Sequence, residues 1–330
     1  MIDAVVLLVT NPRASGGAGA ALAAPAVRGL RAVARVAAEI ETCGDGGDAR
    51  RIAEAAEKTG AGLVVAAGGD GSVGLAVSAL LAVPEAARPA LAILPTGTGN
   101  NAARSFGLRA LRSGDRATAL ALAAIERGAR RGVDVGLVNE RPFLGSFALG
   151  LDGEILRARN RLQPKLAALG LRSDYGLYLA SFALCFATAR QPRFEARLVL
   201  DGVEERRRLY NAVVTNAPVY AGPLRFDGAT ECADGLLDLH ATESAARYVA
   251  EYPQAWIRHL RVLRGASATA SPLLRRARAI VIEPERPVAA QVDGEAWSGA
   301  ASYRLRVLPR AIRVCVPPVL TRGAGSARSR

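Results

Sequence analysis

Three glycine-rich or small-residue turns near the start of the sequence carry the groups best suited to binding phosphate. They read NPRASGG at 11–17, GGDGS at 68–72 and PTGTGNN at 95–101, and each follows a short apolar run. Glycine lets the backbone approach a phosphate closely, and the N–H groups at the start of a following helix attract the anion. The carboxyl ends of parallel strands meet at one edge of a sheet, so the three turns predict a polyphosphate site.

The second and third turns also match a dinucleotide-binding pattern, through Gly69, Gly71 and Gly74 and through Gly97, Gly99 and Ala102. That pattern normally includes an acidic residue about 20 residues later. The next strand instead ends in Pro95 and Thr96. Asp70, inside the second turn, would repel a pyrophosphate unless a cation lay between them. Asp70 therefore favours a nucleotide bound together with Mg²⁺.

Several other kinds of site are excluded by residue type and spacing. The chain has two histidines, His240 and His259, so a zinc site of the HExxH type is not expected. No lysine follows a glycine, which excludes the Walker A loop, and the GxSxG turn of many hydrolases is absent. The four cysteines are scattered without a CxxC pair and predict neither disulfides nor zinc: Cys43, Cys185, Cys232 and Cys315.

The composition is that of a packed globular protein with a basic surface. Half of the 330 residues are apolar and 22% are charged, and the formal net charge is +13. Lys58 and Lys165 are the only lysines, so arginine carries the charge, and part of this excess reflects the composition of the source genome. The arginines form no stripe interleaved with aromatic residues, so nucleic acid is not expected as a partner.

No segment is predicted to cross a membrane. The longest nearly uncharged stretch, 176–189, is shorter than the roughly 20 residues that a membrane-spanning helix requires. The first residues lack the basic region and cleavage site of a signal peptide. We therefore expect a cytoplasmic protein, and its positive charge favours peripheral, reversible association with an anionic membrane surface.

The order of apolar runs predicts two domains of different class. In residues 1–132, strands at 5–9, 63–67 and 91–94 alternate with helices at 19–38 and 73–81. This βαβ pattern is typical of a Rossmann-like parallel sheet. Residues 133–330 contain helices at 153–190 and 244–263 and six candidate strands, at 194–200, 209–215, 236–239, 280–282, 288–292 and 303–307. They predict an antiparallel β-sandwich, with residues from about 309 to 320 returning to the first domain. The expected fold class is α/β plus all-β.

Five sequence elements together resemble the diacylglycerol kinase catalytic family, which includes bacterial lipid kinases, sphingosine kinases and ceramide kinases. They are the NPR turn, GGDGS, LPTGTGNN, the stretch NAPVYAGPLRFDGATECADGLLD at 216–238 and QVDGE at 291–295. The resemblance extends from about residue 4 to residue 316, with the elements in the family's order. It implies an ATP- and Mg²⁺-dependent lipid kinase that transfers the γ-phosphoryl group to a lipid hydroxyl, with a nucleotide-binding domain followed by a lipid-substrate domain.

The resemblance also implies roles for individual residues. The GGDGS turn would hold the triphosphate through Gly68, Gly69, Asp70, Gly71 and Ser72. Further nucleotide contacts would come from Asn11, Thr42, Gly97, Thr98 and Asn100. Mg²⁺ would be bound by Asp234 and the backbone carbonyl of Leu236, and Glu295 would be the general base, with Asp70 as a second catalytic residue.

Three carboxylates have alternative interpretations. Asp293 and Glu295 lie two residues apart, so on one strand they would point the same way and Asp293 would help to hold the metal. Alternatively Asp293–Gly294 is a hairpin turn with solvated charges, because Asp-Gly is common in such turns. Asp152, in the GLDGE segment, would either contact the acceptor head group or be an ordinary turn carboxylate.

Departures from the family pattern keep other functions open. Ser72 replaces the usual threonine, and Leu75 and Asn101 stand where similar sequences have carboxylates. A weakened kinase, or a nucleotide-binding regulatory protein without catalysis, would have such changes. A kinase of a soluble acceptor such as NAD is another alternative, although the ADGLLD and DGE elements argue against it.

The acceptor and the partners are less well specified by the sequence. Diacylglycerol, a sphingoid base, ceramide, phosphatidylglycerol and a glycolipid or polyketide alcohol all remain open. The helix at 244–263 ends in basic residues that would rest on a membrane or extend over the sandwich: Arg258, His259, Arg261 and Arg264. An exposed strand edge in the second domain would allow pairing into a homodimer.

Overall fold

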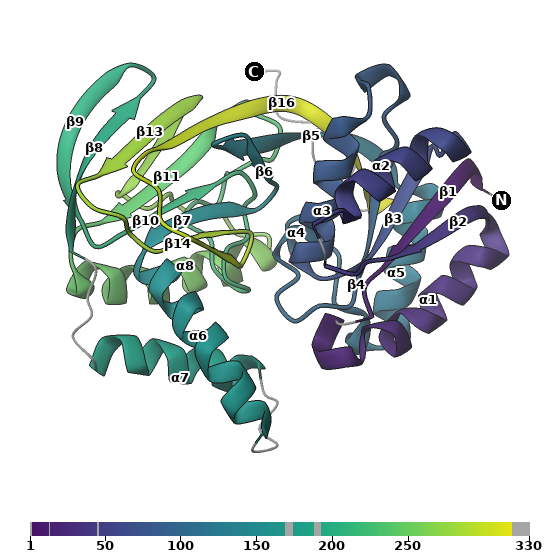
Figure 1. Cartoon of the computed structure of the whole chain (residues 1–330), viewed down its shortest axis with the longest axis horizontal. Helices are drawn as coiled ribbons and strands as arrows, with labels where there is room; N and C mark the ends of the chain where they lie inside the picture. The colour runs from purple at the N-terminus through teal and green to yellow at the C-terminus, as the bar shows by residue number, and fades with distance from the viewer. Residues whose placement is uncertain (1, 13, 45, 169–173, 188–192, 319–330) are drawn as a thin grey trace. The chain divides into compact units, whose positions relative to one another are not determined.

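The computed structural model describes residues 2–12, 14–44, 46–168, 174–187 and 193–318 (Figure 1). The chain divides into two compact units. The first unit comprises Met1–Asp134 and the segment that begins at Pro309, and the second comprises Val135–Leu308. Two long strands, β5 (Ala129–Val138) and β16 (Tyr303–Val316), pass from one unit to the other.

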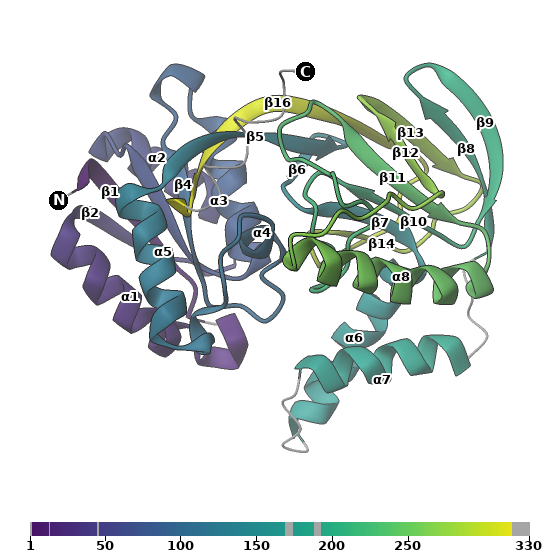
Figure 2. The same cartoon turned by 180° about the vertical axis from the view of Figure 1, so that it is seen from behind.

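The first unit contains a parallel sheet with the strand order β2-β1-β3-β4. Its strands are β1 (Ile2–Thr10), β2 (Ala34–Glu41), β3 (Leu63–Gly68) and β4 (Ala90–Pro95), and the end of β16 pairs with β4. Its helices are α1 (Gly19–Val33), α2 (Asp48–Thr59), α3 (Asp70–Ala82), α4 (Asn101–Ser105) and α5 (Asp115–Arg127). Helix α1 packs with α5 and α2 with α3, and these pairs cover opposite faces of the sheet (Figures 1 and 2).

Burial explains which strands the sequence predicts well. All residues of β3 and β4 are buried, as expected for central strands of a parallel sheet that is covered on both faces. The predicted helix at 19–38 is wrong after residue 33, because β2 begins at Ala34. The alanine-rich segment ARVAAEIE has helical propensity, but it alternates half-buried and exposed residues and pairs along β1 as an edge strand.

The second unit contains two antiparallel layers. One has the order β12-β11-β10-β7-β14-β15, and in the other β16 pairs with β13, β13 with β8 and β8 with β9. These strands are β7 (Ser146–Gly150), β8 (Phe194–Leu200), β9 (Val203–Leu209), β10 (Asn211–Thr215), β11 (Leu237–Thr242), β12 (Leu274–Ala277), β13 (Ala279–Pro284), β14 (Ala290–Val292) and β15 (Glu295–Trp297). The short β6 (Arg141–Phe143) pairs with β5.

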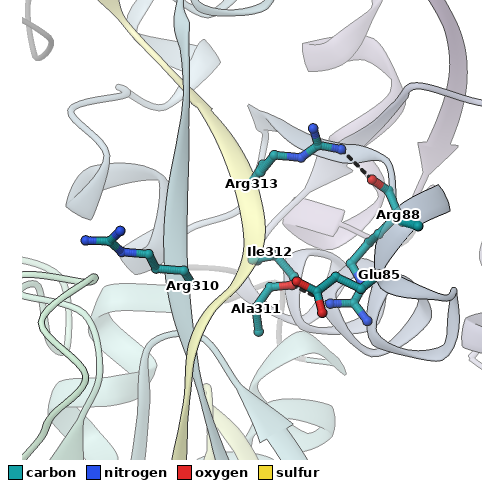
Figure 3. A pocket seen from close by; sticks show the side chains of 7 residues that line it. Glu85, Arg88, Arg310, Ala311, Ile312 and Arg313 are labelled. Atoms are coloured by element: carbon teal, nitrogen blue, oxygen red, sulfur yellow. Dashed lines mark hydrogen bonds between the residues drawn. The ribbon is translucent and has the colours of Figure 1, made fainter.

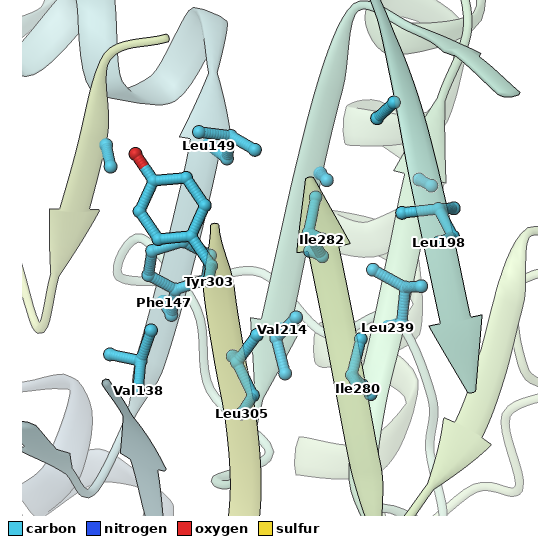
Figure 4. Packing of buried hydrophobic residues seen from close by; sticks show 14 of the residues in the cluster. Val138, Phe147, Leu149, Leu198, Val214, Leu239, Ile280, Ile282, Tyr303 and Leu305 are labelled. Carbon is cyan, nitrogen blue, oxygen red and sulfur yellow. The ribbon is translucent and has the colours of Figure 1, made fainter. Parts of the chain in front are cut away.

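Side chains from both layers form one core (Figure 4). Phe147 and Val214 of one layer meet Ile282 and Tyr303 of the other among fully buried neighbours. Alternate residues of each strand point into this core, as in other β-sandwiches. The parallel first sheet and the antiparallel second unit confirm the fold class expected from the sequence.

Three helices accompany the sandwich: α6 (Leu151–Ala168), α7 (Asp174–Ala187) and α8 (Ala245–Leu263). The single helical region expected at 153–190 thus contains two helices, and residues 169–173 between them lie outside the described residues. Among the described helices, none has the length and apolar character needed to cross a bilayer.

Candidate active site

The turns that follow β3 and β4 lie against each other in the first unit. A Cβ atom added to Gly97 would lie 2.4 Å from the Cα of Gly69, and the backbone N–H of Thr96 donates to the carbonyl oxygen of Gly68 at 3.1 Å. No side chain fits at this contact. The glycines at 69 and 97 are therefore required for the two turns to pack together.

Asp70, the first residue of α3, joins these two turns through its carboxylate. Oδ1 accepts a hydrogen bond from the backbone N–H of Ala102 at 3.0 Å, and Oδ2 accepts one from Nδ2 of Asn101 at 3.2 Å. Removal from water raises the pKa of Asp70, and the hydrogen bonds from Ala102 and Asn101 partly oppose this shift. Both carboxylate oxygens thus have partners within the protein, in addition to any contact with a cation.

Asn101, a departure from the family pattern, has a structural explanation. Its amide nitrogen faces the Asp70 carboxylate, where a second carboxylate would repel the first. The next residue back, Asn100, is buried with a φ of 51°, and its Nδ2 donates to the Gly97 carbonyl oxygen at 2.6 Å. Its Oδ1 has no hydrogen-bond partner among the described residues, so this turn has an acceptor available for a ligand or water.

The first turn is tied to the same edge of the sheet. Asn11 follows β1, and its Nδ2 donates to Oγ of the buried Ser72 at 3.1 Å. A Cβ at Gly68 would lie 2.1 Å from that oxygen, so Gly68 makes room for this contact. Thr42 follows β2 and is buried, and its N–H donates to the Thr10 carbonyl oxygen. The structure therefore brings Asn11, Ser72 and the glycine turns together.

Positive groups surround the third turn. The guanidinium of Arg104 donates to the Gly99 carbonyl oxygen at 2.9 Å, and that of Arg112 donates to the Thr98 carbonyl oxygen at 2.8 Å. Both arginine side chains are exposed, and the N-terminus of α3 has no side-chain cap. Uncapped N–H groups and nearby cations suit an anionic ligand such as a triphosphate. Neither arginine could be assigned to this turn from the sequence, because their distance from it depends on how the chain folds after residue 101.

A cavity elsewhere in this unit lies away from the glycine turns. It has a volume of about 540 Å³ and is lined by Glu85, Arg88 and residues 310–313 (Figure 3). Arg88 precedes β4, whereas the third turn follows it, so the cavity lies at the other end of that strand. The guanidinium of Arg313 donates to the Arg88 carbonyl oxygen there, and that of Arg88 to the Ala311 carbonyl oxygen.

Glu295 begins β15 in the second unit, and its carboxylate is accessible. Its side chain is 58% exposed, and Oε2 lies 2.7 Å from the guanidinium of Arg141. That guanidinium also lies 5.8 Å from the ring centroid of Trp297. An accessible carboxylate is the kind of group that can accept a proton from a substrate hydroxyl. The role of Arg141 was not predicted, because it is separated from Glu295 by 154 residues along the chain.

Asp293 and Glu295 do not share one strand, so the expectation that they point the same way is wrong. Asp293 and Gly294, with φ values of 46° and 83°, form the two-residue turn between β14 and β15. Asp293 Oδ1 accepts hydrogen bonds from Gly145 N and Ser146 N, and Oδ2 accepts one from Leu144 N. These three bonds, of 2.8 to 2.9 Å, anchor the Glu295 hairpin to the start of β7.

The segment expected to bind Mg²⁺ offers few protein ligands. Asp234 is exposed, and its Oδ1 accepts a hydrogen bond from the backbone N–H of Leu236 at 3.0 Å. The nearby buried carboxylates, Asp227 and Asp238, are both paired with Arg276. Burial raises the pKa of Asp238, against the opposing effects of Thr230 and Arg276. Among the described residues no group of three or more His, Cys, Asp or Glu side chains could hold a metal. Mg²⁺ at Asp234 would therefore take most of its ligands from water or phosphate, as this ion often does.

Asp152 is a buried carboxylate with four partners. Its oxygens accept hydrogen bonds from Asn211 Nδ2 and from the hydroxyls of Tyr220, Tyr248 and Tyr252, at distances from 2.6 to 3.2 Å. It is not a solvated turn residue, since it is only 4% exposed at the start of α6.

A cavity of about 580 Å³ lies further along α6. Four apolar residues, two cationic side chains and one carboxylate line it: Ala158, Leu162, Leu184, Cys185, Arg161, Lys165 and Glu154.

Comparisons with known proteins agree with these features. Residues 5–138 match the diacylglycerol kinase catalytic domain, and residues 146–316 match the YegS C-terminal NAD kinase beta sandwich-like domain. A protein named probable lipid kinase YegS-like, from Pectobacterium atrosepticum, is 31% identical over 276 residues, which cover 82% of this chain and 84% of that protein.

Two further relatives extend the comparison. A diacylglycerol kinase of Mycobacterium tuberculosis is 30% identical over 250 residues, which cover 73% of this chain and 74% of that protein. A crystal structure of a diacylglycerol kinase from Bacillus anthracis superimposes with a TM-score of 0.65 at 19% identity, over 97% of this chain and 99% of that one. This structural likeness concerns the fold alone. With the family matches and the sequence relatives, we conclude that the chain belongs to the diacylglycerol kinase catalytic family and is an ATP-dependent phosphotransferase.

Proposed function

We propose that this enzyme transfers the γ-phosphoryl group of ATP to the hydroxyl of a diacylglycerol-like lipid, with Glu295 as the general base. The observation that carries this proposal is the accessible Glu295 carboxylate on a hairpin that three backbone hydrogen bonds to Asp293 hold in place. A general base must be held in position relative to the hydroxyl from which it takes the proton, and the anchored hairpin provides this.

The phosphoryl donor binds at the turns of the first unit in this account. Phosphoryl transfer requires cations and N–H groups on the phosphate oxygens, with little covalent chemistry from the protein. The N-terminus of α3 offers N–H groups, and Arg104 and Arg112 offer positive charge beside Thr98 and Gly99. Asp70 acts here by holding the two turns together. Mg²⁺, when bound with the nucleotide, would supply further charge neutralisation, with Asp234 and the Leu236 carbonyl as its candidate protein ligands.

The reaction uses the acceptor hydroxyl as the nucleophile. Its oxygen forms a bond to the γ-phosphorus while the bond from that phosphorus to the bridging oxygen of ADP breaks, and ADP leaves. Glu295 takes the hydroxyl proton, so charge and atoms balance. The Arg141 guanidinium, at 2.7 Å, orients the carboxylate.

The second unit has features that suit an acceptor with acyl chains. The cavity along α6 has apolar walls from Ala158, Leu162, Leu184 and Cys185, and the charged side chains of Glu154, Arg161 and Lys165 also line it. Such a lining favours hydrocarbon next to an anionic or polar head group. The relative from M. tuberculosis is named a diacylglycerol kinase, which makes diacylglycerol the first acceptor to test.

The proposal is tested by incubating the purified protein with ATP labelled at the γ-phosphate and mixed micelles that each present one lipid. The panel contains diacylglycerol, ceramide, sphingosine and phosphatidylglycerol, with and without Mg²⁺. We expect label in the diacylglycerol sample, dependent on Mg²⁺. Label only in another lipid would change the acceptor. No label in any lipid, with ATP binding intact, would contradict the proposal and favour a soluble acceptor or a regulatory role.

A further inference from the structure

Helix α8 buries charged side chains on its inner face and exposes large apolar side chains on its outer face. Its buried residues are Tyr248, Glu251, Ala255, Arg258 and His259. Its exposed residues include Val249, Trp256, Ile257 and Leu263, with 49%, 49%, 51% and 67% of their surfaces accessible. A helix on the surface of a water-soluble protein normally has the opposite arrangement.

The inner polar residues hold α8 in this orientation. The Arg258 guanidinium contacts the Glu251 carboxylate at 2.6 Å and donates to the Thr269 carbonyl oxygen at 3.0 Å. His240 of β11 lies 3.7 Å from the same carboxylate. Rotation of the helix to bury its apolar face would break these buried contacts and leave charges without partners, which is costly. The apolar outer face is therefore a stable feature of the second unit.

Most of the large apolar side chains that are exposed among the described residues lie on this outer face. Six such side chains are exposed, and four of them lie on α8, which Figure 2 shows as one continuous helix beside the strands of the second unit. The other two, Leu184 and Val203, lie on α7 and β9. An exposed apolar group of this kind indicates a surface that contacts a partner.

Charge indicates which partner this is. Arg247, Arg261 and Arg264 are exposed on the same helix or at its end, and the helix has no exposed acidic residue among those described. Tryptophan beside arginine is typical of the boundary between water and lipid, where the ring enters the head-group region and the guanidinium binds lipid phosphate. The formal charge of the chain, +13, adds attraction to an anionic surface.

We propose that the outer face of α8 docks this enzyme on the surface of an anionic bilayer, with Trp256, Ile257 and Leu263 inserted among the lipids and Arg261 and Arg264 on lipid phosphates. The inference deepens the proposed function, since a kinase of a bilayer lipid must reach that bilayer. It does not depend on turnover, because docking requires neither ATP nor an acceptor.

Tryptophan fluorescence tests the insertion directly. The chain has two tryptophans, Trp256 and Trp297, so the variant Trp297→Phe leaves Trp256 as the only reporter. Vesicles of phosphatidylcholine with and without phosphatidylglycerol are added, without ATP or diacylglycerol. We expect a blue shift of the emission and quenching by brominated acyl chains only with the anionic vesicles. Unchanged emission at saturating vesicle concentration would overturn the proposal.

Vesicle sedimentation with a matched control separates docking from general surface hydrophobicity. The double variant Trp256→Ser/Ile257→Ser removes apolar groups from α8, and Val203→Ser removes one from β9 that is 66% exposed. We expect the double variant to bind anionic vesicles at least tenfold more weakly and Val203→Ser to bind like the wild type. Arg261→Gln and Arg264→Gln should each weaken binding about fivefold. Equal binding by all variants would overturn the proposal.

Light scattering in solution tests whether a second copy of the chain, and not a bilayer, occupies the outer face of α8. We expect the wild type and the double variant to have the same mass. A dimer that the double variant dissociates would show that a second copy occupies the face, and would overturn the proposal. The docking experiments are independent of the proposed function. A protein that docks on vesicles but phosphorylates no lipid would contradict the proposed function and leave the docking proposal intact.

Discussion

The carboxylate of Asp70 accepts a hydrogen bond from the backbone N–H of Ala102 at 3.0 Å, and so joins the turn after β3 to the turn after β4. We predict that Asp70→Ala lowers the free energy of unfolding by about 1–3 kcal/mol, because it leaves that N–H without its acceptor. It should also raise KM for ATP, since the turn at 95–101 is then less well fixed. Urea unfolding and steady-state kinetics measure both effects.

Asp115→Ala is the matched control for this prediction. Asp115 also begins a helix after a glycine N-cap, but its side chain is exposed. This substitution removes a carboxylate from a helix N-terminus, which should lower the free energy of unfolding by about 0.3–1 kcal/mol. KM for ATP should stay at the wild-type value. Equal effects of the two substitutions on KM would show that Asp70 does not act through the second turn.

Asn101→Asp introduces a carboxylate beside Asp70 and should make stability depend on pH. Burial already raises the pKa of Asp70 above its ordinary value of 3.8, and a neighbouring charge raises it further. A carboxylate whose pKa is raised in the folded state favours the unfolded chain when it is ionised. This destabilisation is absent below the ordinary pKa of 3.8 and grows as the pH rises through the raised pKa of the folded state.

We therefore expect Asn101→Asp to lose about 1–3 kcal/mol at neutral pH and less at acidic pH, as measured by urea unfolding at both. Asn101→Ser, which loses the amide without adding charge, should be destabilised by a similar amount at each pH. A variant Asn101→Asp as stable as the wild type at neutral pH would contradict this account of the turn.

The sequence predicted elements whose signal is local. β3 and β4 are short apolar runs that end at turn residues, so both were found, and the glycines of the turns after them were assigned to the right edge of the sheet. The edge strand β2 was missed because its residues alternate charge with alanine, in a composition that also suits a helix. The short strand β7 was missed because SFALG has no alternation, although it lies in the middle of its layer.

Long-range partners could not be predicted in the same way. Arg141 contacts Glu295, and Asp293 accepts hydrogen bonds from residues 144–146, only because β14 pairs with β7. For Arg258 the sequence left open a membrane contact or a place over the sandwich, and the structure buries it against Glu251. In each case the single sequence shows the residue type, whereas the pairing of strands and the rotation of a helix decide what that residue contacts.

Asp293→Ala should lower both stability and turnover. It removes the acceptor for three backbone N–H groups, which should cost about 1–3 kcal/mol and displace the hairpin that positions Glu295. Asp201→Ala is the control, because Asp201 and Gly202 form a similar turn, with φ values of 46° and 88°, and Asp201 accepts hydrogen bonds from Arg278 N and Ala279 N. We expect comparable losses of stability but a lower kcat only for Asp293→Ala. Equal kcat values in the two variants would refute a positioning role.

Glu251 should control part of the stability at acidic pH. Burial raises its pKa, but interactions with His240, Ser271 and Arg258 outweigh this effect and lower the pKa from 4.5 to about 2. The ionised form therefore stabilises the fold by about 3 kcal/mol above the ordinary pKa, and this contribution is lost as the pH falls through about 2.

Glu251→Gln should remove that pH dependence. The variant is expected to be less stable than the wild type at neutral pH, because Arg258 loses its buried partner. Between pH 5 and pH 2 its free energy of unfolding should change by about 3 kcal/mol less than that of the wild type. Parallel curves for the two proteins over this range would show that Glu251 is not the responsible group.

The most direct test of the account compares Glu295→Gln with Glu204→Gln in the lipid phosphorylation assay. Both glutamates are more than half exposed and pair with an arginine, Glu295 with Arg141 at 2.7 Å and Glu204 with Arg197 at 2.8 Å. Both variants should keep their stability within about 0.5 kcal/mol and bind ATP normally. We expect Glu295→Gln to lower kcat by about 10²- to 10⁴-fold and Glu204→Gln to match the wild type. A kcat for Glu295→Gln close to the wild-type value would contradict the assignment of Glu295 as the general base.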